Sequence, residues 1–464
     1  MITRYLTYCF LIFGFILNAQ ELQNTMTLSE YLGYVKTFHP LVKQANLVVT
    51  EGEAKLLKSR GAFDPKIDVD YDRKKFKNTE YFDKLNTTFK IPTWFGIEIK
   101  GQLEQNDGVF LNPEANVPTD GLYNVGVSVP VARGLLINER MAVLKQSKLF
   151  LDQSKEDRKL LVNEILYKAT KAYFNWLRYY NEKEVYRTFL ENANTRFKGI
   201  KRNFETGQSA AIDTTEARIA LNNRKLSLEN AKLQLIKAQL NLSNFLWIQD
   251  TPVELTDNVI PDVETPNVIN DALGLSTMSF NGFDVNAHPK MQSLNYKFEG
   301  LRVERRLNRN NLLPKVDLEY NFLSETPEIM NSFNTVNYKA GLNISFPLFL
   351  RKERGNLKLA NAKMQATEFE IDATRVSLNN KINSINQEIE SYDIQSNLTT
   401  DIVSDYQKLL TAEERKFTVG ESSLFLINSR ESKLIEARLK AIEIDYKLFN
   451  SKAKLFNNVV FDNL

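Results

Sequence analysis

Residues 61–72 read GAFDPKIDVDYD, and this short stretch decides how the rest of the chain is read. After the proline, two sets of residues alternate, Ile67, Val69 and Tyr71 with Asp68, Asp70 and Asp72. Successive side chains of a β-strand point to opposite faces, so the alternation predicts a strand with one apolar and one acidic face. Residues 313–321, LPKVDLEYN, nearly repeat the pattern far downstream. The strand therefore belongs to a repeated unit.

The whole chain follows this internal repeat. His39-Pro40 and His288-Pro289 each open a helical stretch, and a second proline, Pro65 or Pro314, ends it at the same distance from the histidine. Residues 128–134 (SVPVARG) resemble residues 345–355 (SFPLFLRKERG), and residues 202–209 (RNFETGQS) resemble residues 415–422 (RKFTVGES). We expect a first repeat at 20–249 with strands at about 66–130, a linker at 250–286, and a second repeat at 287–464 with strands at about 315–347.

Long helices dominate both repeats. Proline is absent between Leu135 and Gly207, and apolar residues recur there in steps of three and four: Val162, Leu166, Ala169, Tyr173, Trp176 and Tyr180. A helix of about 70 residues is roughly 105 Å long. Glycine then turns each long helix into a second one, with tips near Gly207 and Gly420. After Gly207 one apolar seam contains Leu221, Leu228 and Leu235 and is broken by Arg224, while a second contains Ile219, Leu226, Leu233 and Leu240. Two seams predict two helical neighbours.

The N-terminus and the composition indicate an exported protein. An apolar run from Tyr5 to Leu17 follows Arg4 and ends near Ala19, so residues 1–19 are predicted to be a signal peptide. The only cysteine, Cys9, lies inside it, so we expect no disulfide in the exported chain. The 60 basic and 57 acidic residues nearly balance, which gives no reason to expect nucleic acid as a partner.

The sequence offers no motif for catalysis, a cofactor or a metal site. The only histidines, His39 and His288, precede prolines and are better interpreted as helix N-caps than as ligands. We find no phosphate-binding loop and no nucleophile elbow, so an enzyme is not expected.

The alternating segments favour a membrane barrel over a soluble half-buried sheet, although period two fits both. We predict three strands in the first repeat, at about 67–71, 89–99 and 123–129, and two in the second, at about 316–322 and 338–346. A bacterial barrel needs at least about eight strands, so one chain cannot close it. Because open sheet edges are not tolerated in lipid, a membrane location requires an oligomer. Three strands also have the wrong parity for returning to the same side of a membrane, so one of them must bend, pair outside the membrane or form an extracellular extension.

The doubled order of helix, strands, long helix, glycine turn and long helix resembles the TolC-like outer-membrane efflux proteins. The motifs that carry the resemblance are the His-Pro helix starts, the prolines Pro65 and Pro314, the segments SVPVARG and SFPLFLRKERG, and the tips FETG and FTVG. The resemblance implies a mainly helical chain whose two repeats of coiled-coil helices form an α-barrel in the periplasm. It also implies a homotrimer in which each chain adds four strands to a shared β-barrel in outer-membrane lipid.

The resemblance further implies a passive exit duct for a tripartite efflux or type I secretion system. The tips would meet a periplasmic adaptor and an inner-membrane pump, which directs attention to Phe204, Gly207, Phe417 and Gly420. Acidic residues near the first tip, Asp213 and Glu216, are candidates for a tunnel constriction, and a solvated helix face is the simpler alternative. The strand acids would face water in the lumen: Asp68, Asp70, Asp72, Asp317 and Glu319.

One alternative function remains open from the sequence. A periplasmic coiled-coil adaptor or structural protein would account for every heptad without a membrane barrel. It would leave the sharply two-faced strands unexplained.

Overall fold

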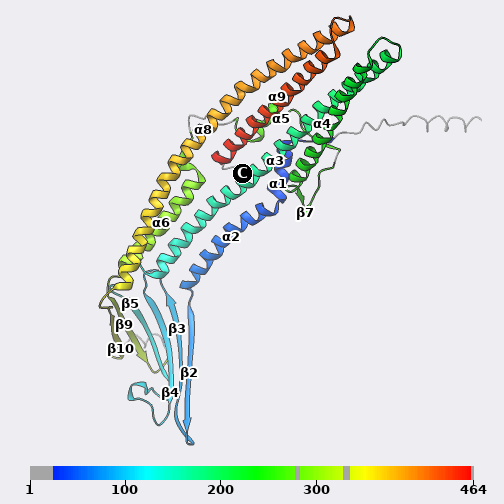
Figure 1. Ribbon diagram of the computed structural model, residues 1–464. Coiled ribbons are helices and arrows are strands. Elements are labelled where there is room, and N and C mark those ends of the chain that lie inside the picture. The colour runs from blue at the N-terminus through cyan, green and yellow to red at the C-terminus, as the bar shows by residue number, and fades with distance from the viewer. Residues whose placement is uncertain (1–23, 257, 277–282, 328–334, 461–464) are drawn as a thin grey trace, which may run out of the picture. The chain divides into compact units, whose positions relative to one another are not determined.

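The computed structural model describes residues 24–256, 258–276, 283–327 and 335–460 (Figure 1). Most of them are helical, and the strands form one six-stranded sheet and two sheets of two strands. The described residues divide into two compact units. Unit 1 is drawn from 1–43, 162–283 and 381–464, and unit 2 from 44–161 and 284–380. Each unit thus contains parts of both sequence repeats. The predicted signal peptide, 1–19, lies outside the described residues.

Unit 1 is built from helices packed along apolar seams. Its helices are α1 (Leu28–Phe38), the later part of α3 (Glu139–Glu205), α4 (Ala211–Ser243), α5 (Thr265–Ala272), the later part of α8 (Arg351–Thr418) and α9 (Leu424–Val459). Five of the six predicted residues of the α3 seam, Val162, Leu166, Ala169, Tyr173 and Trp176, are buried, whereas Tyr180 is only partly buried. The first seam of α4 is buried as well. Heptad spacing therefore identified the core of this unit correctly.

Two short sheets join the linker predicted at 250–286 to the rest of unit 1. The parallel pair β1 (Asn24–Met26) and β8 (Val259–Pro261), and the antiparallel pair β6 (Trp247–Ile248) and β7 (Thr251–Pro252), form them. The hydroxyl of Tyr173 donates to the carbonyl oxygen of Met26 at 2.8 Å and accepts from the backbone N–H of Asp262 at 3.2 Å. Burial raises the pKa of Tyr173 to about 12, so this hydroxyl keeps its proton and its bonds at neutral pH.

Unit 2 contains the six-stranded sheet and the helices that lead into and out of it. The helices are α2 (Pro40–Arg60), the early parts of α3 and α8, and α6 (Pro289–Asn310), with 3-10 turns η1 (Gly61–Phe63), η2 (Pro113–Ala115) and η4 (Val285–Ala287). The strands are β2 (Lys66–Phe76), β3 (Thr79–Pro92), β4 (Glu98–Asp107), β5 (Leu122–Pro130), β9 (Lys315–Ser324) and β10 (Tyr338–Ser345). The sheet order is β10-β9-β5-β4-β3-β2, and every pair is antiparallel.

The strand count corrects the prediction for the first repeat. That repeat contributes four strands rather than three, and the chain contributes six to one sheet rather than the four that the resemblance implies. The predicted strand at 89–99 is interrupted by a turn in which Thr93 N–H bonds to Ile97 oxygen at 2.9 Å and Gly96 has a φ of +79°. A hairpin at Lys77 and Asn78, both with positive φ, separates β2 from β3. With four strands the chain returns to the side from which it left, which resolves the parity problem.

The two histidines act as helix caps, as predicted. The Nδ1 atom of His39 accepts a hydrogen bond from the backbone N–H of Leu41 at 3.2 Å, and that of His288 accepts one from Lys290 at 3.1 Å. Each histidine therefore satisfies a backbone donor that the first turn of a helix leaves unpaired.

Among the described helices we find none whose length and hydrophobicity suffice to cross a membrane.

Candidate functional site: the two-faced sheet and the helical tips

The six-stranded sheet keeps one apolar face and one polar face across its full width. The register places mainly apolar residues on one face of neighbouring strands, as in the row Val125, Phe322 and Tyr338. The apolar face consists of Ile67, Val69 and Tyr71 on β2, Leu85, Phe89 and Ile91 on β3, Ile99 and Leu103 on β4, Tyr123, Val125, Val127 and Val129 on β5, Val316, Leu318, Tyr320 and Phe322 on β9, and Tyr338, Ala340, Leu342 and Ile344 on β10. The resulting surface is mainly apolar, with the polar Thr87 on β3 and Gln105 on β4 among its members.

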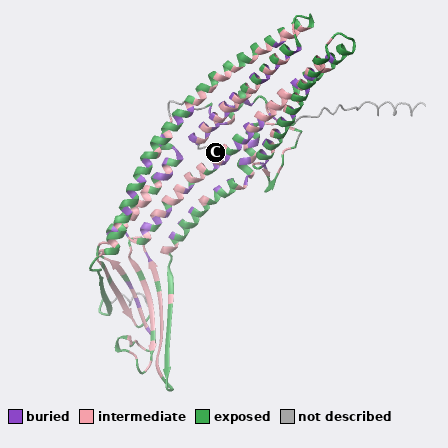
Figure 2. Cartoon of the chain, viewed as in Figure 1, coloured by how far each residue is buried: buried purple, intermediate pink, exposed green. Residues whose placement is uncertain are grey.

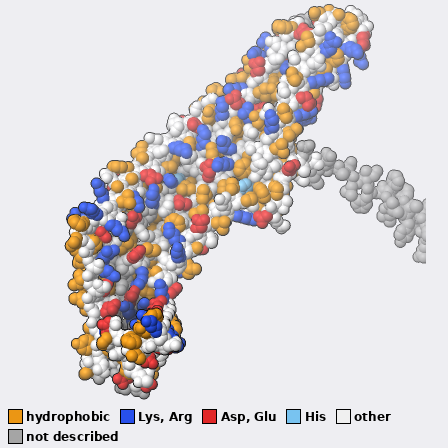
Figure 3. Space-filling view, turned by 60° about the horizontal axis from the view of Figure 1, so that its bottom comes forward, with side chains coloured by type: hydrophobic (Ala, Val, Ile, Leu, Met, Phe, Trp, Pro, Cys, Tyr) orange, Lys and Arg blue, Asp and Glu red, His pale blue; other side chains and the backbone are white. Residues whose placement is uncertain are grey.

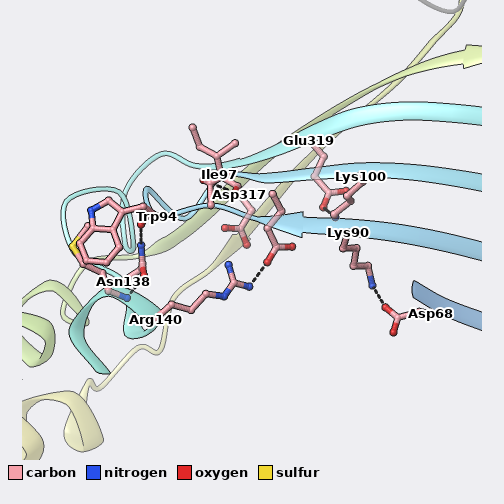
Figure 4. A network of polar contacts seen from close by, with 12 residues as sticks. Asp68, Lys90, Trp94, Ile97, Lys100, Asn138, Arg140, Asp317 and Glu319 are labelled. Atoms are coloured by element: carbon pink, nitrogen blue, oxygen red, sulfur yellow. Dashed lines mark hydrogen bonds and ion pairs between the residues drawn. The ribbon is translucent and has the colours of Figure 1, made fainter. Parts of the chain in front are cut away.

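Charged side chains on the polar face bridge neighbouring strands. The Nζ atom of Lys90 lies 2.8 Å from a carboxylate oxygen of Asp68, and that of Lys100 lies 2.7 Å from Glu319 (Figure 4). Lys315 contacts Asp317 at 3.1 Å on the same strand. Three of the five acids predicted for the lumen are thus paired with lysines, and the face carries both signs of charge rather than acids alone.

The same face continues to the start of α3. Arg140 bonds to Glu98, and the side chain of Asn138 donates to the carbonyl oxygen of Trp94 at 2.9 Å (Figure 4). Asn138 also accepts from Met141 N–H at 2.8 Å and so caps the helix. A polar hollow of about 660 Å³ lies here, lined among others by Lys100, Arg140, Lys315, Glu98, Asp317 and Glu319. These side chains make the base of the polar face charged, and the bonds of Asn138 and Arg140 tie the strand end to the start of the helix.

The remaining predicted lumen acids lie on the edge strand. Asp70 and Asp72 are exposed on β2, on the face that holds Asp68. Figure 2 shows β2 as exposed along nearly its whole length, whereas β3 to β5 are mostly intermediate. The other edge, β10, is exposed at every residue. Both edges of the sheet are therefore open within the described part of the chain.

The two helical tips share one hydrogen-bonded turn. At the first, Gly207 N–H bonds to Phe204 oxygen at 3.0 Å and Gln208 N–H to Asn203 oxygen at 2.7 Å. At the second, the equivalent bonds from Gly420 and Glu421 measure 3.1 and 2.9 Å. This is the Schellman arrangement, which requires a left-handed residue, and the two glycines have φ values of +78° and +81°. Both glycines therefore lie in turns between two helices, and their place at a periplasmic end stays a prediction.

The two tip phenylalanines differ in their packing. Phe417 packs against a buried cluster of Ile200, Ala217 and Leu424, which joins three helices of unit 1. Phe204 is 44% exposed and belongs to the surface of its tip. The sequence pairs these residues in one motif, whereas the structure gives the first to the surface and the second mainly to the core.

A buried ion network lies below the tips, and the sequence did not identify it. Glu431 on α9 is 1% exposed, and its carboxylate contacts Arg196 of α3 at 2.7 Å and Arg224 of α4 at 3.2 Å. Arg224 also donates to the hydroxyl of Ser432 at 3.0 Å, and Arg196 lies 3.6 Å from Glu414 of α8. We call these five residues the tip network. Its signal in the sequence was the break that Arg224 makes in the α4 seam.

The two candidate constriction residues have local structural partners. The carboxylate of Asp213 accepts from the backbone N–H of Ala210 at 3.2 Å and so satisfies the start of α4. Glu216 accepts from the side-chain amide of Asn428 at 3.0 Å and links α4 to α9. These bonds fit helix capping and interhelical contact, and they leave a role in a constriction as a prediction.

Charged and apolar side chains alternate over the surface. Figure 3 shows lysine, arginine, aspartate and glutamate interspersed along the visible face, with apolar patches between them. No large field of one sign is visible there, in agreement with the near balance of 60 basic and 57 acidic residues. Neither observation suggests a polyanionic partner.

Comparisons with known proteins agree with these features. The family model described as "Outer membrane efflux protein" matches residues 123–246 and 286–457, which is more than half of the chain. A search of curated protein sequences gives no match.

Several solved outer-membrane proteins share the fold. The chain is similar to the Campylobacter jejuni CmeC outer membrane channel, with 14% identity and a TM-score of 0.64 over 93% of this chain and 85% of that one. It is similar to the Vibrio cholerae outer membrane protein VceC, with 12% identity and a TM-score of 0.63 over 93% and 95% of the two chains. The open state of the Neisseria gonorrhoeae MtrE outer membrane channel also matches, with 12% identity and a TM-score of 0.62 over 93% and 88%.

Proposed function

The chain belongs to the outer membrane efflux protein family, and from this premise we propose that three copies of it assemble into one passive duct. The protein is an outer-membrane exit duct rather than an enzyme, and its helices extend into the periplasm. The proposal adds the number of copies and the partners: a periplasmic adaptor and an inner-membrane pump of a tripartite efflux or type I secretion system. The pump supplies the energy, and the duct makes and breaks no bonds.

The observation that carries the proposal is the second seam of α4. Ile219, Leu226, Leu233 and Leu240, which we call the outer seam, are between 49% and 63% exposed. The seam on the opposite side of the same helix, which contains Leu221, Leu228 and Leu235, is buried against the rest of unit 1. A helix with two apolar stripes requires two partners. Within the described residues the chain supplies only one of them.

Helix α8 offers a complementary surface. Ile394, Leu398, Ile402 and Leu409 are exposed on it in steps of four, four and seven, within unit 1. Another side of α8 is buried, where Leu410 packs with Phe189 of α3 and Ile427 of α9. We therefore pair the outer seam of α4 with the exposed side of α8 from the next copy. A contact between two different surfaces that is repeated by a closing rotation generates a ring.

The sheet supports a wall between lipid and water. Its apolar face matches the outward band of a membrane barrel, and its paired charges suit a hydrated interior. The five acids Asp68, Asp70, Asp72, Asp317 and Glu319 would face the lumen together with Lys90, Lys100 and Lys315. We therefore expect a lumen of mixed charge rather than an acidic pore.

The tips supply a surface for the adaptor and the pump. Exposed apolar side chains gather around Gly207 and Gly420, where Phe204, Ile212, Val419 and Phe425 are between 44% and 73% exposed. Phe417 lies beneath them and supports the second tip from inside. A photo-crosslinking residue at Phe204 should capture a periplasmic partner, and the same residue at Phe417 should capture only copies of this chain.

A constriction near the tips is tested through ion selectivity. We place Asp213 and Glu216 toward the tunnel axis. Asp213→Asn keeps a hydrogen-bond acceptor for Ala210 and removes the charge, so the ratio of cation to anion permeability should fall while assembly is preserved. An unchanged ratio in Asp213→Asn and in Glu216→Gln would assign both residues to the solvated helix surface.

The decisive experiment measures mass and conductance together. Once the mass of bound detergent is subtracted, the particle extracted from the outer membrane should have three times the mass of one chain. It should also form channels in planar bilayers. Leu226→Glu places a charge in the outer seam and should shift the particle to monomers with loss of conductance. Lys225→Glu adds the same side chain about 100° around the helix and should leave the trimer intact.

Two outcomes would reject the proposal. A monomeric wild-type particle without conductance would favour the coiled-coil adaptor or structural protein considered as the alternative. Equal assembly of Leu226→Glu and wild type would show that the outer seam is not the contact between copies.

A further inference from the structure

We propose that all six strands of each chain enter the barrel wall, with β2 of one copy paired to β10 of the next. The inference rests on the proposed trimer: six strands from each of three copies give a barrel of eighteen strands. This differs from the resemblance, which implies four strands from each chain. The extra pair is the hairpin of β2 and β3, which continues the sheet instead of standing apart from it.

The first argument is the apolar face of the extra hairpin. Ile67 lies opposite Phe89 and Tyr71 lies opposite Leu85, so the mainly apolar face of the central strands continues onto the edge strand. Ile67, Val69 and Tyr71 are 69%, 60% and 57% exposed in the single chain. Burying these side chains in lipid would remove a large apolar area from water, whereas a hairpin held in water would keep it exposed.

The second argument is the extent of that apolar surface along β2. Toward the hairpin turn, the next position on the apolar face is Arg73, opposite Asp83, and the register shifts just beyond it, between Lys74 and Lys75. Arg73 bonds to Glu80 at 2.6 Å and lies 3.6 Å from Asp83. The hydroxyl of Tyr71 donates to Asp83 at 3.0 Å, at the border between the two zones. An apolar band that ends at a tyrosine and then at charged residues is typical of a strand leaving the membrane at the interface.

The third argument is the direction of the two open edges. All five pairings in the sheet are antiparallel, so the first and sixth strands, β10 and β2, run in opposite directions. When copies are related by rotation about the barrel axis, β2 of one copy therefore meets β10 of the next as an antiparallel neighbour. The ladder of the sheet then continues without a break, and no edge remains open in lipid.

The register gives a quantitative check. Within one chain, a row of paired residues crosses the sheet from Lys66 on β2 to Lys339 on β10. The residues between them in this row are Lys90, Lys100, Gly126 and Asn321. Lys66 is the first residue of β2, whereas Lys339 lies six residues before Ser345, the last of β10. Both strand ends adjoin the helical part of unit 2. If neighbouring copies keep these ends level, Lys66 pairs with Ser345 and Asp72 pairs with Lys339 of the next copy.

This register yields a reasonable barrel. From one copy to the next, the register shifts by six residues of about 3.3 Å each, while the barrel wall advances by six strand spacings of about 4.8 Å. The ratio of these two lengths corresponds to a strand tilt of about 35°. Tilts of about 35–45° are normal for closed barrels. The same register sets Ile67 against Ile344 and Val69 against Leu342 on the apolar face, and Asp72 against Lys339 on the polar face. Geometry, hydrophobicity and charge agree on one pairing.

The consequence is a wider exit. Barrel diameter grows roughly linearly with strand number, so eighteen strands would give a barrel about half as wide again as twelve. For strands of a given length, their tilt then sets how far the barrel extends along its axis. A wide barrel with paired charges on its inner face would admit large hydrated solutes.

Disulfide cross-linking tests the pairing between copies. The only native cysteine, Cys9, lies in the predicted signal peptide, so introduced cysteines report without background. Asp72→Cys with Lys339→Cys should give a reducible covalent trimer, because facing residues of an antiparallel pair lie about 4.5–5.5 Å apart between Cα atoms, within disulfide range. The matched control is Glu104→Cys with Lys339→Cys, which would cross-link if β4 were the edge of a four-stranded contribution.

A second measurement does not depend on the register. A spin label at Val69 should be relaxed by oxygen dissolved in lipid, and one at Asp70 by a water-soluble nickel chelate. Contact of both positions with water would place β2 outside the membrane and overturn the inference.

The cross-linking outcomes separate this inference from the proposed function. Cross-linking only in the Glu104 pair leaves the trimeric duct in place and rejects six-stranded closure. A trimer with no cross-link in either pair rejects the proposed β2–β10 register and with it the inference. A monomer instead rejects the proposed function itself, through the mass measurement described above.

Discussion

The two repeats use the same turns but differ in what lies between them. Each starts a helix with a capping histidine and reverses its long helix at a Schellman glycine, Gly207 or Gly420. The first repeat then contributes four strands and the second contributes two. In the tip network the first repeat supplies both arginines, Arg196 and Arg224, and the second supplies the buried glutamate.

This difference shows which parts of the unit tolerate change. A hairpin adds two strands at once, so the chain still returns to the same side of the sheet and the following helix keeps its direction. A single added strand would reverse everything after it. Turns and helix ends are less tolerant, because they must satisfy backbone groups with a limited set of residues. Length therefore varies between the repeats in steps of a hairpin, while the turns stay alike.

The largest expected effect comes from breaking the charge link between the repeats. Glu431→Gln leaves Arg196 and Arg224 without their buried counter-charge and should lower the free energy of unfolding by about 3 kcal/mol. Glu414→Gln, which alters a more exposed partner of Arg196, should cost less than about 1 kcal/mol. Urea unfolding followed by circular dichroism measures both. Equal losses would show that burial of Glu431 is not what makes the contact strong.

The next largest expected effect is a loss of stability that distinguishes β5, the last strand of the first repeat, from β10, the last strand of the second. A Cβ atom on Gly126 would lie 2.4 Å from the backbone oxygen of Tyr320, so Gly126→Ala should destabilise the sheet by about 1–3 kcal/mol. A Cβ atom on Gly341 meets only the Cβ of Glu319 at 3.9 Å, and Gly341→Ala should be tolerated. Each variant is heated in steps, and the temperature at which its folded form disappears on a gel is compared between Gly126→Ala and Gly341→Ala. Similar temperatures would contradict the difference in packing.

A smaller effect distinguishes the helices that follow the two tips. The hydroxyl of Ser423 accepts from Leu426 N–H at 3.3 Å at the start of α9, whereas α4 begins after Ala210, which has no capping side chain. Ser423→Ala should cost about 1 kcal/mol, and Ala210→Ser should gain about 0.5 kcal/mol. Hydrogen exchange in the first turn of each helix reports these changes locally. Faster exchange at α4 in Ala210→Ser would contradict the prediction.

The smallest effect is a pH dependence at the start of the first repeat. Burial lowers the pKa of His39 from its usual 6.5, so the unfolded chain takes up this proton at a higher pH than the folded chain does. The cap is thus fully present above pH 6.5, and its contribution, about 0.5 kcal/mol, is lost as the pH falls through 6.5 toward the lowered pKa.

His39→Asn should remove that pH dependence, because asparagine caps a helix without titrating. The melting temperatures of wild type and variant at pH 7.5 and 5.5 provide the comparison. An identical drop in both proteins would assign the pH dependence to other groups.

The sequence predicted the repeats, the long helices and both tips because each leaves a local signal. It missed the boundary between β3 and β4, since Phe95 and Ile97 continue the alternation through a turn. It also missed the β2–β3 hairpin, whose turn is formed by Lys77 and Asn78 rather than by a glycine pair. In β3 the run Asn86, Thr87 and Thr88 hides the alternation that pairing with β2 and β4 establishes.

The candidate site was predictable to a lesser degree. The polar face of the sheet followed from the alternation, but its lysine partners depend on register, which a single strand does not encode. The tip network required knowing that α3, α4 and α9 meet at one level. Its local traces were the break that Arg224 makes in the α4 seam and the charged residue Glu431 between the buried Ile427 and Leu434.

The exposed outer seam of α4 has a consequence for biogenesis. A newly exported copy carries a row of leucine and isoleucine side chains into an aqueous compartment before any neighbour is present. An exposed apolar row of this kind favours aggregation and proteolysis, so under the proposed assembly the survival of a copy depends on how quickly it meets the others or on a chaperone that shields this helix. A soluble peptide with the sequence of residues 391–412 would compete for the same row and stop assembly while every subunit remained correctly folded.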